Sequence, residues 1–102
     1  MADTINKEEL KKQLETNDVN LIEVLSPEDF KKLHIQGAIN IPYQEIVQQA
    51  DDKFNKDDNI VVYCSDYECT SSGIAVKKLE ESGYTNVKHY QGGKKEWRDA
   101  GY

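Results

Sequence analysis

The stretch VVYCSDYECTSSGIA, residues 61–75, decides the fold because it joins an apolar strand to a helix through a polar loop. Residues 60–63 are continuously apolar and mostly β-branched, a pattern typical of a central strand covered on both faces. After the loop, small and apolar residues recur at helical spacing, at Ser72, Ala75, Val76 and Leu79. The loop itself contains both cysteines of the chain, Cys64 and Cys69.

Helical and strand patterns alternate along the rest of the sequence. We expect strands over residues 20–25, 37–42, 60–63 and 86–90. We expect helices over residues 7–15, 43–50 and 94–100, a short helix that begins at residue 27, and a helix that begins at residue 72 and ends at Gly83. Asn6 and Ser26 are typical N-cap residues. Strands separated by helices predict parallel pairing through right-handed crossovers, hence an open α/β sheet with helices on both faces. We expect one domain over residues 1–102, because the sequence has no repeat or linker.

The composition limits which binding partners and which cellular compartment we expect for this chain. Thirteen basic and nineteen acidic residues give a net charge of −6, which disfavours binding to nucleic acid or to anionic membranes. The densest basic pairs, Lys77–Lys78 and Lys94–Lys95, are interpreted as solvated helix faces. Because no basic start precedes an apolar run, we expect neither a secretory signal nor a membrane span, and a monomer in the cytoplasm.

Two cysteines in a reducing compartment favour thiol chemistry over a structural disulfide framework. A zinc site needs about four ligands, whereas His34 and His89 stand alone in the sequence, so we expect neither a metal nor a cofactor. We interpret both histidines as structural hydrogen-bonding residues rather than as catalytic bases.

Cys64 ends the central strand and precedes a helix. In open parallel sheets the reactive crevice lies beyond the carboxyl ends of the strands. The unpaired N–H groups at the start of the next helix can hold an anion and lower the pKa of a cysteine. Alternatively, Cys64 is a small buried residue that completes a core strand. Its position favours chemistry.

Three motifs in the right order give the chain a resemblance to single-domain members of the rhodanese (sulfurtransferase) family. HIQGAINIP at residues 34–42 resembles the family signature G-H-I-x-G-A-x-N-I-P, with Leu33 in place of the leading glycine. GGKKEW at residues 92–97 resembles the family's G-G-x-x-x-W, and VVYC at residues 61–64 matches the strand that ends in the nucleophilic cysteine. The resemblance implies a parallel sheet of five strands flanked by helices, the additional strand being a short one near residues 4–5.

The same resemblance implies a role for the loop. Cys64 would take the outer sulfur of a donor, carry it as a persulfide and pass it to an acceptor thiol. The backbone N–H groups of the loop would bind the terminal sulfur as an anion, and these belong to Ser65, Asp66, Tyr67, Glu68, Cys69 and Thr70. The partners would be a small-molecule or protein sulfur donor and a thiol acceptor.

The loop departs from the family pattern C-x-x-G-x-R-S. No Lys or Arg occurs between Cys64 and Lys77, which removes the residue that would neutralise a phosphate and excludes phosphatase activity. Asp66 and Glu68 should repel the thiosulfate dianion. We therefore expect a thiol-bound or protein-bound persulfide as the donor. Residues 23–25 read Glu-Val-Leu where the family commonly has Asp-Val-Arg, so a supporting arginine is missing as well.

Cys69 leaves alternatives open. It is either a resolving thiol that attacks a persulfide or sulfenate on Cys64, or a loop residue without a role. Three functions follow: a sulfurtransferase, which we favour; a thiol redox protein that cycles a disulfide between Cys64 and Cys69; and an inactive rhodanese-like interaction module.

Overall fold

The computed structural model describes residues 3–102 and contains one parallel sheet of five strands. The sheet has the order β1-β5-β4-β2-β3. The strands are β1 (Asp3–Thr4), β2 (Asn20–Glu23), β3 (Ile39–Asn40), β4 (Ile60–Tyr63) and β5 (Val87–His89). Every strand pair is parallel, and β4 lies in the middle of the sheet. The predicted α/β class and the additional short strand near the start of the chain are confirmed.

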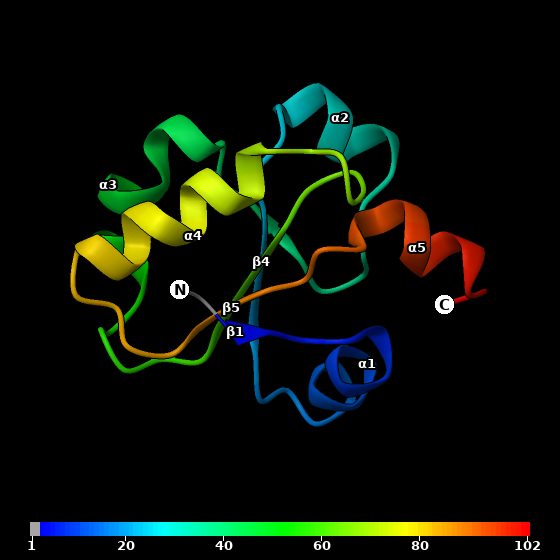
Figure 1. Cartoon of the computed structure of the whole chain (residues 1–102), viewed down its shortest axis with the longest axis horizontal. Coiled ribbons are helices and arrows are strands. Elements are labelled where there is room, and N and C mark those ends of the chain that lie inside the picture. The colour runs from blue at the N-terminus through cyan, green and yellow to red at the C-terminus, as the bar shows by residue number, and fades with distance from the viewer. Residues whose placement is uncertain (1–2) are drawn as a thin grey trace.

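Helices cover both faces of this sheet. They are α1 (Lys7–Glu15), α2 (Pro27–Lys32), α3 (Ile46–Lys53), α4 (Ser71–Glu81) and α5 (Gly93–Asp99). Side chains of α3 and α4 pack on one face, and side chains of α1 and α5 pack on the other. Figure 1 shows α3 and α4 on one side of β4 and α1 and α5 on the other.

The sequence of β4 explains its central position. Side chains alternate between the two faces of a strand, so Ile60 and Val62 belong to the core under α3 and α4. Val61 and Tyr63 belong to the core under α1 and α5. All four residues are buried, as the continuous apolar run predicts.

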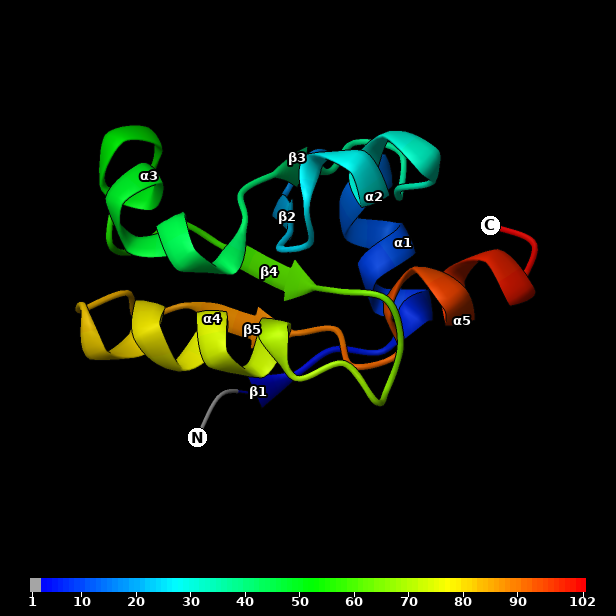
Figure 2. The ribbon, with the colours of Figure 1, turned by 90° about the horizontal axis from the view of Figure 1, so that it is seen from above.

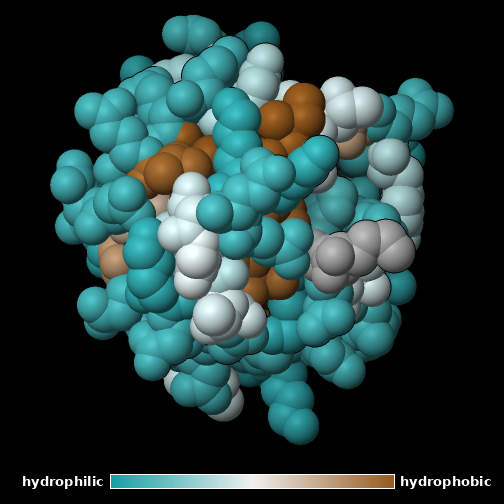
Figure 3. Space-filling view, turned by 60° about the vertical axis from the view of Figure 1, so that its left-hand side comes forward, coloured by the Kyte–Doolittle hydropathy of each residue, from teal (hydrophilic) through white to brown (hydrophobic). Residues whose placement is uncertain are grey.

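The ends of the helices agree with the sequence signals. The Asn6 side chain accepts a hydrogen bond from the Glu9 N–H at 2.8 Å, and Ser26 accepts one from the Asp29 N–H at 3.2 Å. Gly83 follows α4 with a φ of +98°, which a glycine adopts readily. Lys77 and Lys78 are exposed on the outer face of α4, and Figure 3 shows this side of the molecule as mostly hydrophilic.

The helix expected over residues 43–50 is wrong at both ends. A 3-10 turn covers Tyr43–Glu45, and α3 then continues to Lys53. The tighter turn directly follows Pro42, and such short 3-10 turns are frequent where an α-helix begins.

A buried carboxylate joins both halves of the fold. Glu23, on β2, is 0% exposed. Its Oε1 accepts a hydrogen bond from the Tyr63 hydroxyl at 2.8 Å, and its Oε2 forms an ion pair with Lys94 Nζ at 3.1 Å. The Tyr63 hydroxyl in turn accepts the Ile35 N–H at 3.1 Å. Both carboxylate oxygens therefore have partners, as a buried charge requires.

The interpretation of Lys94 as a solvated residue is wrong. Its side chain is only 13% exposed, whereas Lys95 beside it is exposed. Besides Glu23, the Lys94 ammonium donates to the carbonyl oxygens of Asp29, at 3.0 Å, and Leu33, at 2.7 Å. Three acceptors satisfy its three N–H bonds, which allows a lysine to be buried there.

The start of α5 also holds the loop that follows β4. The backbone N–H of Lys94 donates to the Cys64 carbonyl at 3.1 Å, and that of Lys95 to the Ser65 carbonyl at 2.9 Å. Figure 1 shows this loop passing close to α5. Gly93 permits the approach, since it has a φ of +67° and a Cβ there would lie 2.6 Å from the Cys64 carbonyl oxygen.

Removing the charge of Lys94 should destabilise the fold strongly. We expect Lys94→Met to lower the free energy of unfolding by about 3–5 kcal/mol, because Glu23 would be left buried without its counter-ion. Urea denaturation measures the change. The matched control is Lys95→Met, which removes only an exposed ion pair with Asp99 and should cost less than about 0.5 kcal/mol.

A double variant separates charge from packing. Glu23→Gln in the Lys94→Met background should recover part of the lost stability, since the amide oxygen still accepts from Tyr63 and no charge stays buried. Equal costs for Lys94→Met and Lys95→Met would contradict a structural role for the ion pair.

Gly93→Ala should cost more than the same change at Gly83. Both glycines have positive φ, and alanine in that conformation costs about 1–2 kcal/mol. Only at Gly93 does the new methyl group also collide with the loop backbone, which adds about 1–3 kcal/mol. Thermal and urea unfolding of both variants test this. Equal losses of stability would mean that α5 does not need to approach the loop so closely.

Candidate active site

Cys64 directly follows β4, at the carboxyl edge of the sheet. It is 1% exposed and packs with Val24, Ala75 and other residues of the core beneath α3 and α4. The segment 64–70 then crosses to the first turn of α4, which Figure 2 shows as the bend between β4 and α4. The sulfur of Cys64 therefore lies between a rigid strand and a helix N-terminus.

The loop brings the two cysteines together. Cys64 and Cys69 form a disulfide, with their Cα atoms 6.3 Å apart. This separation lies within the range that a disulfide can span. Cys69 is half-buried, so it is the more accessible of the two sulfur atoms to an incoming thiol. The two residues, five positions apart in the sequence, therefore meet across the curl of the loop.

Asp66 gives the loop its curl. Its Oδ1 accepts the Glu68 N–H at 3.0 Å, and its carbonyl accepts the Cys69 N–H at 3.3 Å. Such short-range bonds from an aspartate are typical of tight turns. In this conformation the N–H groups of Glu68 and Cys69 are therefore occupied, whereas the binding of an anion by the loop stays a prediction.

The remaining loop N–H groups are available. Those of Ser65, Asp66, Tyr67 and Thr70 have no hydrogen-bond acceptor among residues 3–102. In addition, no side chain caps α4, since the Thr70 hydroxyl forms no capping bond. The helix N-terminus retains unpaired donors that favour a negative charge nearby.

Tyr67 fastens the exposed part of the loop to α5. Its ring is 67% exposed, and its hydroxyl donates to Glu96 Oε2 at 3.0 Å. The other oxygen of Glu96 accepts from the Tyr90 hydroxyl at 2.8 Å. Burial, followed by the Glu96 contact, raises the pKa of Tyr90, so this hydroxyl stays a donor. Tyr67 thus contributes a fixed point of the loop, which sequence reasoning did not identify.

Two polar side chains lie behind Cys64. Ser72 Oγ is 3.1 Å from Cys64 Sγ and 2.6 Å from His89 Nε2. Ser72 belongs to the first turn of α4, and His89 ends β5. From the sequence, Ser72 is a helix residue and one of four candidate hydroxyl donors to the sulfur, and His89 is interpreted as a structural residue. Their contact depends on how α4 crosses the sheet, which local sequence does not reveal.

His34 lies elsewhere. Its Nδ1 is 2.8 Å from the Phe30 carbonyl, and its ring stacks on that of Phe30 with centroids 3.8 Å apart. No three of the His, Cys, Asp and Glu side chains in the described part of the chain are grouped as a metal site requires. No helix among residues 3–102 has the length and hydrophobicity to span a bilayer.

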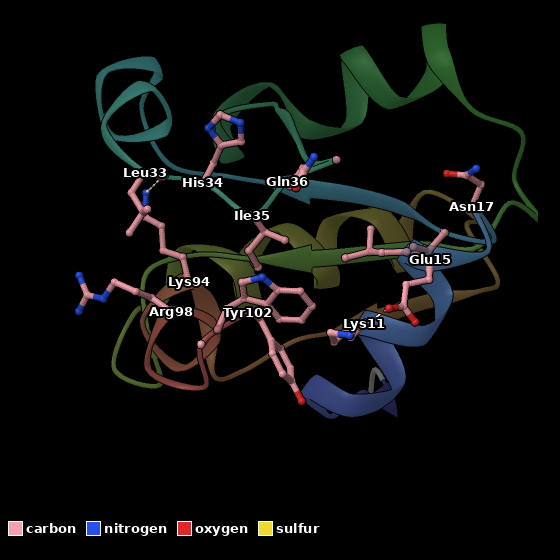
Figure 4. Close-up of a pocket in the computed structure, with 15 residues that line it drawn as sticks. Lys11, Glu15, Asn17, Leu33, His34, Ile35, Gln36, Lys94, Arg98 and Tyr102 are labelled. Carbon is pink, nitrogen blue, oxygen red and sulfur yellow. Dashed lines mark hydrogen bonds and ion pairs between the residues drawn. The ribbon is translucent and has the colours of Figure 1, made fainter.

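A large hollow of the surface is separate from the cysteines. It has a volume of about 810 Å³ and lies between α1, α5 and residues 33–37 (Figure 4). Lys94 borders it while donating to the Leu33 carbonyl. The other labelled side chains come from α1, α5 and residues 33–36, together with Asn17 just after α1 and Tyr102 just after α5. Because no residue of the 64–70 loop lines this hollow, its size does not mark the reactive site.

Comparisons with known proteins agree with this arrangement. The family model described as the rhodanese-like domain matches residues 6–100. The thiosulfate sulfurtransferase PspE of Escherichia coli is 41% identical over 72 residues, which are 70% of this chain and 67% of that protein. The structure of the human single-domain sulfurtransferase TSTD1 superposes with a TM-score of 0.82 and 26% identity, covering 97% of each chain.

A further relative combines this domain with additional sequence. The HTH-type transcriptional regulator Rv0324 of Mycobacterium tuberculosis is 35% identical over 99 residues, which are 97% of this chain and 43% of that protein. The chain thus spans less than half the length of that regulator. With its sheet order, its Cys64 loop and these matches, the chain belongs to the rhodanese-like domain family.

Proposed function

We propose that this chain is a sulfurtransferase that carries sulfane sulfur as a persulfide on Cys64. The observation that carries the proposal is the position of Cys64, between the central strand β4 and the unpaired N–H groups at the start of α4, in a rhodanese-like domain. Such a position stabilises a thiolate without a basic side chain. The sulfurtransferases among the relatives support the same reaction class.

The reaction has two displacements. In the reduced protein, the Cys64 thiolate attacks the outer sulfur of a donor persulfide R–S–SH; a new S–S bond forms, the donor S–S bond breaks, and R–S⁻ leaves. An acceptor thiolate R′–S⁻ then attacks the outer sulfur of the Cys64 persulfide and leaves as R′–S–SH, which restores the Cys64 thiolate. Because the enzyme is modified between two half-reactions, the kinetics should be ping-pong.

The donor is a thiol-bound or protein-bound persulfide rather than thiosulfate. Asp66 and Glu68 bring two carboxylates into the loop, and no Lys or Arg occurs from residue 65 to residue 76. A dianion would meet repulsion there, whereas a persulfide carries at most one negative charge, on the sulfur that the free N–H groups can bind.

The disulfide favours a second candidate function, a thiol redox cycle. If the Cys69 thiolate attacks the inner sulfur of the Cys64 persulfide, the S–S bond between Cys64 and Cys69 forms and HS⁻ leaves. A dithiol reductant, itself oxidised to a disulfide, would then return both cysteines to thiols. The proximity of Cys64 and Cys69 supports Cys69 as a resolving residue, and a reducing compartment such as the cytoplasm would supply the reductant.

Single serine variants of the two cysteines should behave oppositely. After reduction and exposure to a glutathione persulfide, intact mass should show one added sulfur atom on the wild type and none on Cys64→Ser. Cys69→Ser should keep the added sulfur longer, because no neighbouring thiol displaces it as HS⁻. Circular dichroism confirms that each variant is folded.

The outcomes separate the candidates. Sulfur added to Cys64→Ser at the wild-type rate would exclude Cys64 as the persulfide carrier. Equal persulfide lifetimes in wild type and Cys69→Ser, without disulfide formation, would exclude Cys69 as the resolving thiol and leave plain sulfur transfer. The redox cycle without a sulfur donor is tested with a peroxide, which oxidises the Cys64 thiolate to a sulfenic acid, from which the Cys69 thiolate displaces hydroxide. A disulfide formed reversibly with peroxide, and no persulfide formed with the sulfur donor, would favour that cycle.

Neutralising Glu68 should improve the use of thiosulfate. At a separation of roughly 6 Å in water, removing one charge changes the energy by about 0.7 kcal/mol for each unit of charge on the donor. Glu68→Gln should therefore raise kcat/KM for thiosulfate about threefold to tenfold at low ionic strength, and salt should reduce the gain. Glu68 suits this test because its side chain forms no hydrogen bond or ion pair with residues 3–102.

The matched control is Glu81→Gln, which makes the same charge change at the far end of α4. Its thiosulfate kinetics should stay at the wild-type values. An unchanged kcat/KM in Glu68→Gln at low ionic strength would argue against repulsion as the cause of weak thiosulfate use.

A further inference from the structure

Cys64, Ser72 and His89 form a continuous line of polar contacts from three separate elements. Cys64 Sγ lies 3.1 Å from Ser72 Oγ, which lies 2.6 Å from His89 Nε2. Ser72 is 1% exposed, and His89 is half-buried. A buried hydroxyl that touches a sulfur on one side and an imidazole on the other can transmit a proton between them.

We propose that Ser72 and His89 form a proton relay that controls the ionisation of Cys64, with Ser72 as a catalytic residue in contact with the sulfur and His89 as a positioning residue that acts through Ser72. This inference rests on the proposed role of Cys64 as the reactive thiol. It assigns a function to two residues that the sulfur-transfer steps above do not use.

The relay operates by concerted proton movement. In the reduced protein the Cys64 S–H donates its proton to Ser72 Oγ, and the Ser72 O–H proton passes to His89 Nε2. A thiolate and an imidazolium result, the serine hydroxyl is restored, and no electron is gained or lost. The thiolate can then attack the donor persulfide.

The direction of the hydrogen bonds reverses in the disulfide. Cys64 Sγ carries no proton there, so it can only accept from Ser72 Oγ, and the relay then requires the His89 tautomer in which Nε2–H donates to Ser72. Both bonds then point toward Cys64. When an external thiolate attacks Cys69, Cys64 is the leaving group, and its developing negative charge is already hydrogen-bonded.

The surroundings of His89 suit a proton acceptor. The residues that face it from the elements packed against it are uncharged, namely Thr4 on β1, Val62 on β4, and Ser72 and Gly73 on α4. The neighbouring charged residues of the strands, Asp3 and Lys88, pair one position away, where side-chain alternation directs them to the other face. The charged residues of α4 begin at Lys77, more than a turn beyond Ser72.

Burial lowers the pKa of the His89 imidazole. The ring is therefore neutral near neutral pH and has a lone pair for the relay. Protonation at lower pH would remove that lone pair, so the thiol should lose reactivity as the solution is acidified through the His89 pKa. A histidine that only fills space would leave the thiol profile unaffected.

The test is the rate of Cys64 alkylation by iodoacetamide as a function of pH, measured in a Cys69→Ser background so that one thiol reacts. Ser72→Ala and His89→Gln should each slow alkylation about tenfold near neutral pH, equivalent to raising the thiol pKa by about one unit. Each variant should also remove the inflection that the titration of His89 produces in the plot of alkylation rate against pH. The double variant should be no slower than either single one, because the two residues act as a unit.

His34→Gln is the matched control, since His34 contacts Phe30 and no residue of the cysteine loop. His34→Gln should leave the pH profile of alkylation the same as in the Cys69→Ser parent. NMR titration of the wild type supplies a second measurement: the His89 imidazole should have a higher pKa in the reduced protein than in the disulfide, since a thiolate favours the imidazolium. If Ser72→Ala does not fold, His89→Gln and this titration still test the relay.

Two results would overturn the relay. One is a double variant in which the two losses of alkylation rate add while the pH profile of the rate keeps its shape. The other is an equal His89 pKa in the reduced protein and in the disulfide. Alkylation requires no sulfur donor, so the two proposals fail separately. Shifted profiles without persulfide formation would uphold the relay and refute sulfur transfer. Persulfide formation with unshifted profiles would do the reverse.

Discussion

The buried carboxylate of Glu23 is the constraint on which the rest of the structure depends. A charge removed from water must have a counter-ion and hydrogen-bond donors, and here Lys94 and Tyr63 provide them. Lys94 can reach Glu23 only if α5 begins close to the carboxyl edge of the sheet. The backbone N–H of Lys94 then donates to the carbonyl of Cys64. The same residue thus neutralises the core charge and fixes the start of the reactive loop.

The loop has its own internal supports, and they are acidic or aromatic instead of basic. Asp66 closes a turn over Glu68 and Cys69, and Tyr67 attaches the outer part of the loop to Glu96. This conformation directs Cys69 toward Cys64, and four backbone N–H groups of the loop have no acceptor within residues 3–102. The site can therefore hold a singly charged sulfur with backbone dipoles alone, and a nearby thiol is available to displace it. This geometry supports the proposed transfer of sulfur between thiols.

Much of the fold could be predicted because its signals are local. The Asn6 and Ser26 caps, the apolar run of β4 and the stop at Gly83 each lie where the sequence indicates. The alternation of strands and helices then limits the topology to a parallel sheet. The errors also have physical reasons. Lys94 is largely buried because its ammonium pairs with Glu23, which is distant in the sequence. The 3-10 turn that precedes α3 follows Pro42 directly.

The sequence by itself determined the fold class, the family resemblance and the position of Cys64 at the end of the central strand, because periodicity, caps and motifs are carried by neighbouring residues. Only the tertiary structure decided which side chains surround that sulfur. Cys69 meets Cys64 because Asp66 curls the loop. Ser72 touches Cys64 because α4 crosses that edge of the sheet. His89, which contacts Ser72, lies at the end of β5, 25 residues after Cys64 in the sequence. These contacts join residues that are distant in sequence, and their distances depend on packing rather than on any local pattern.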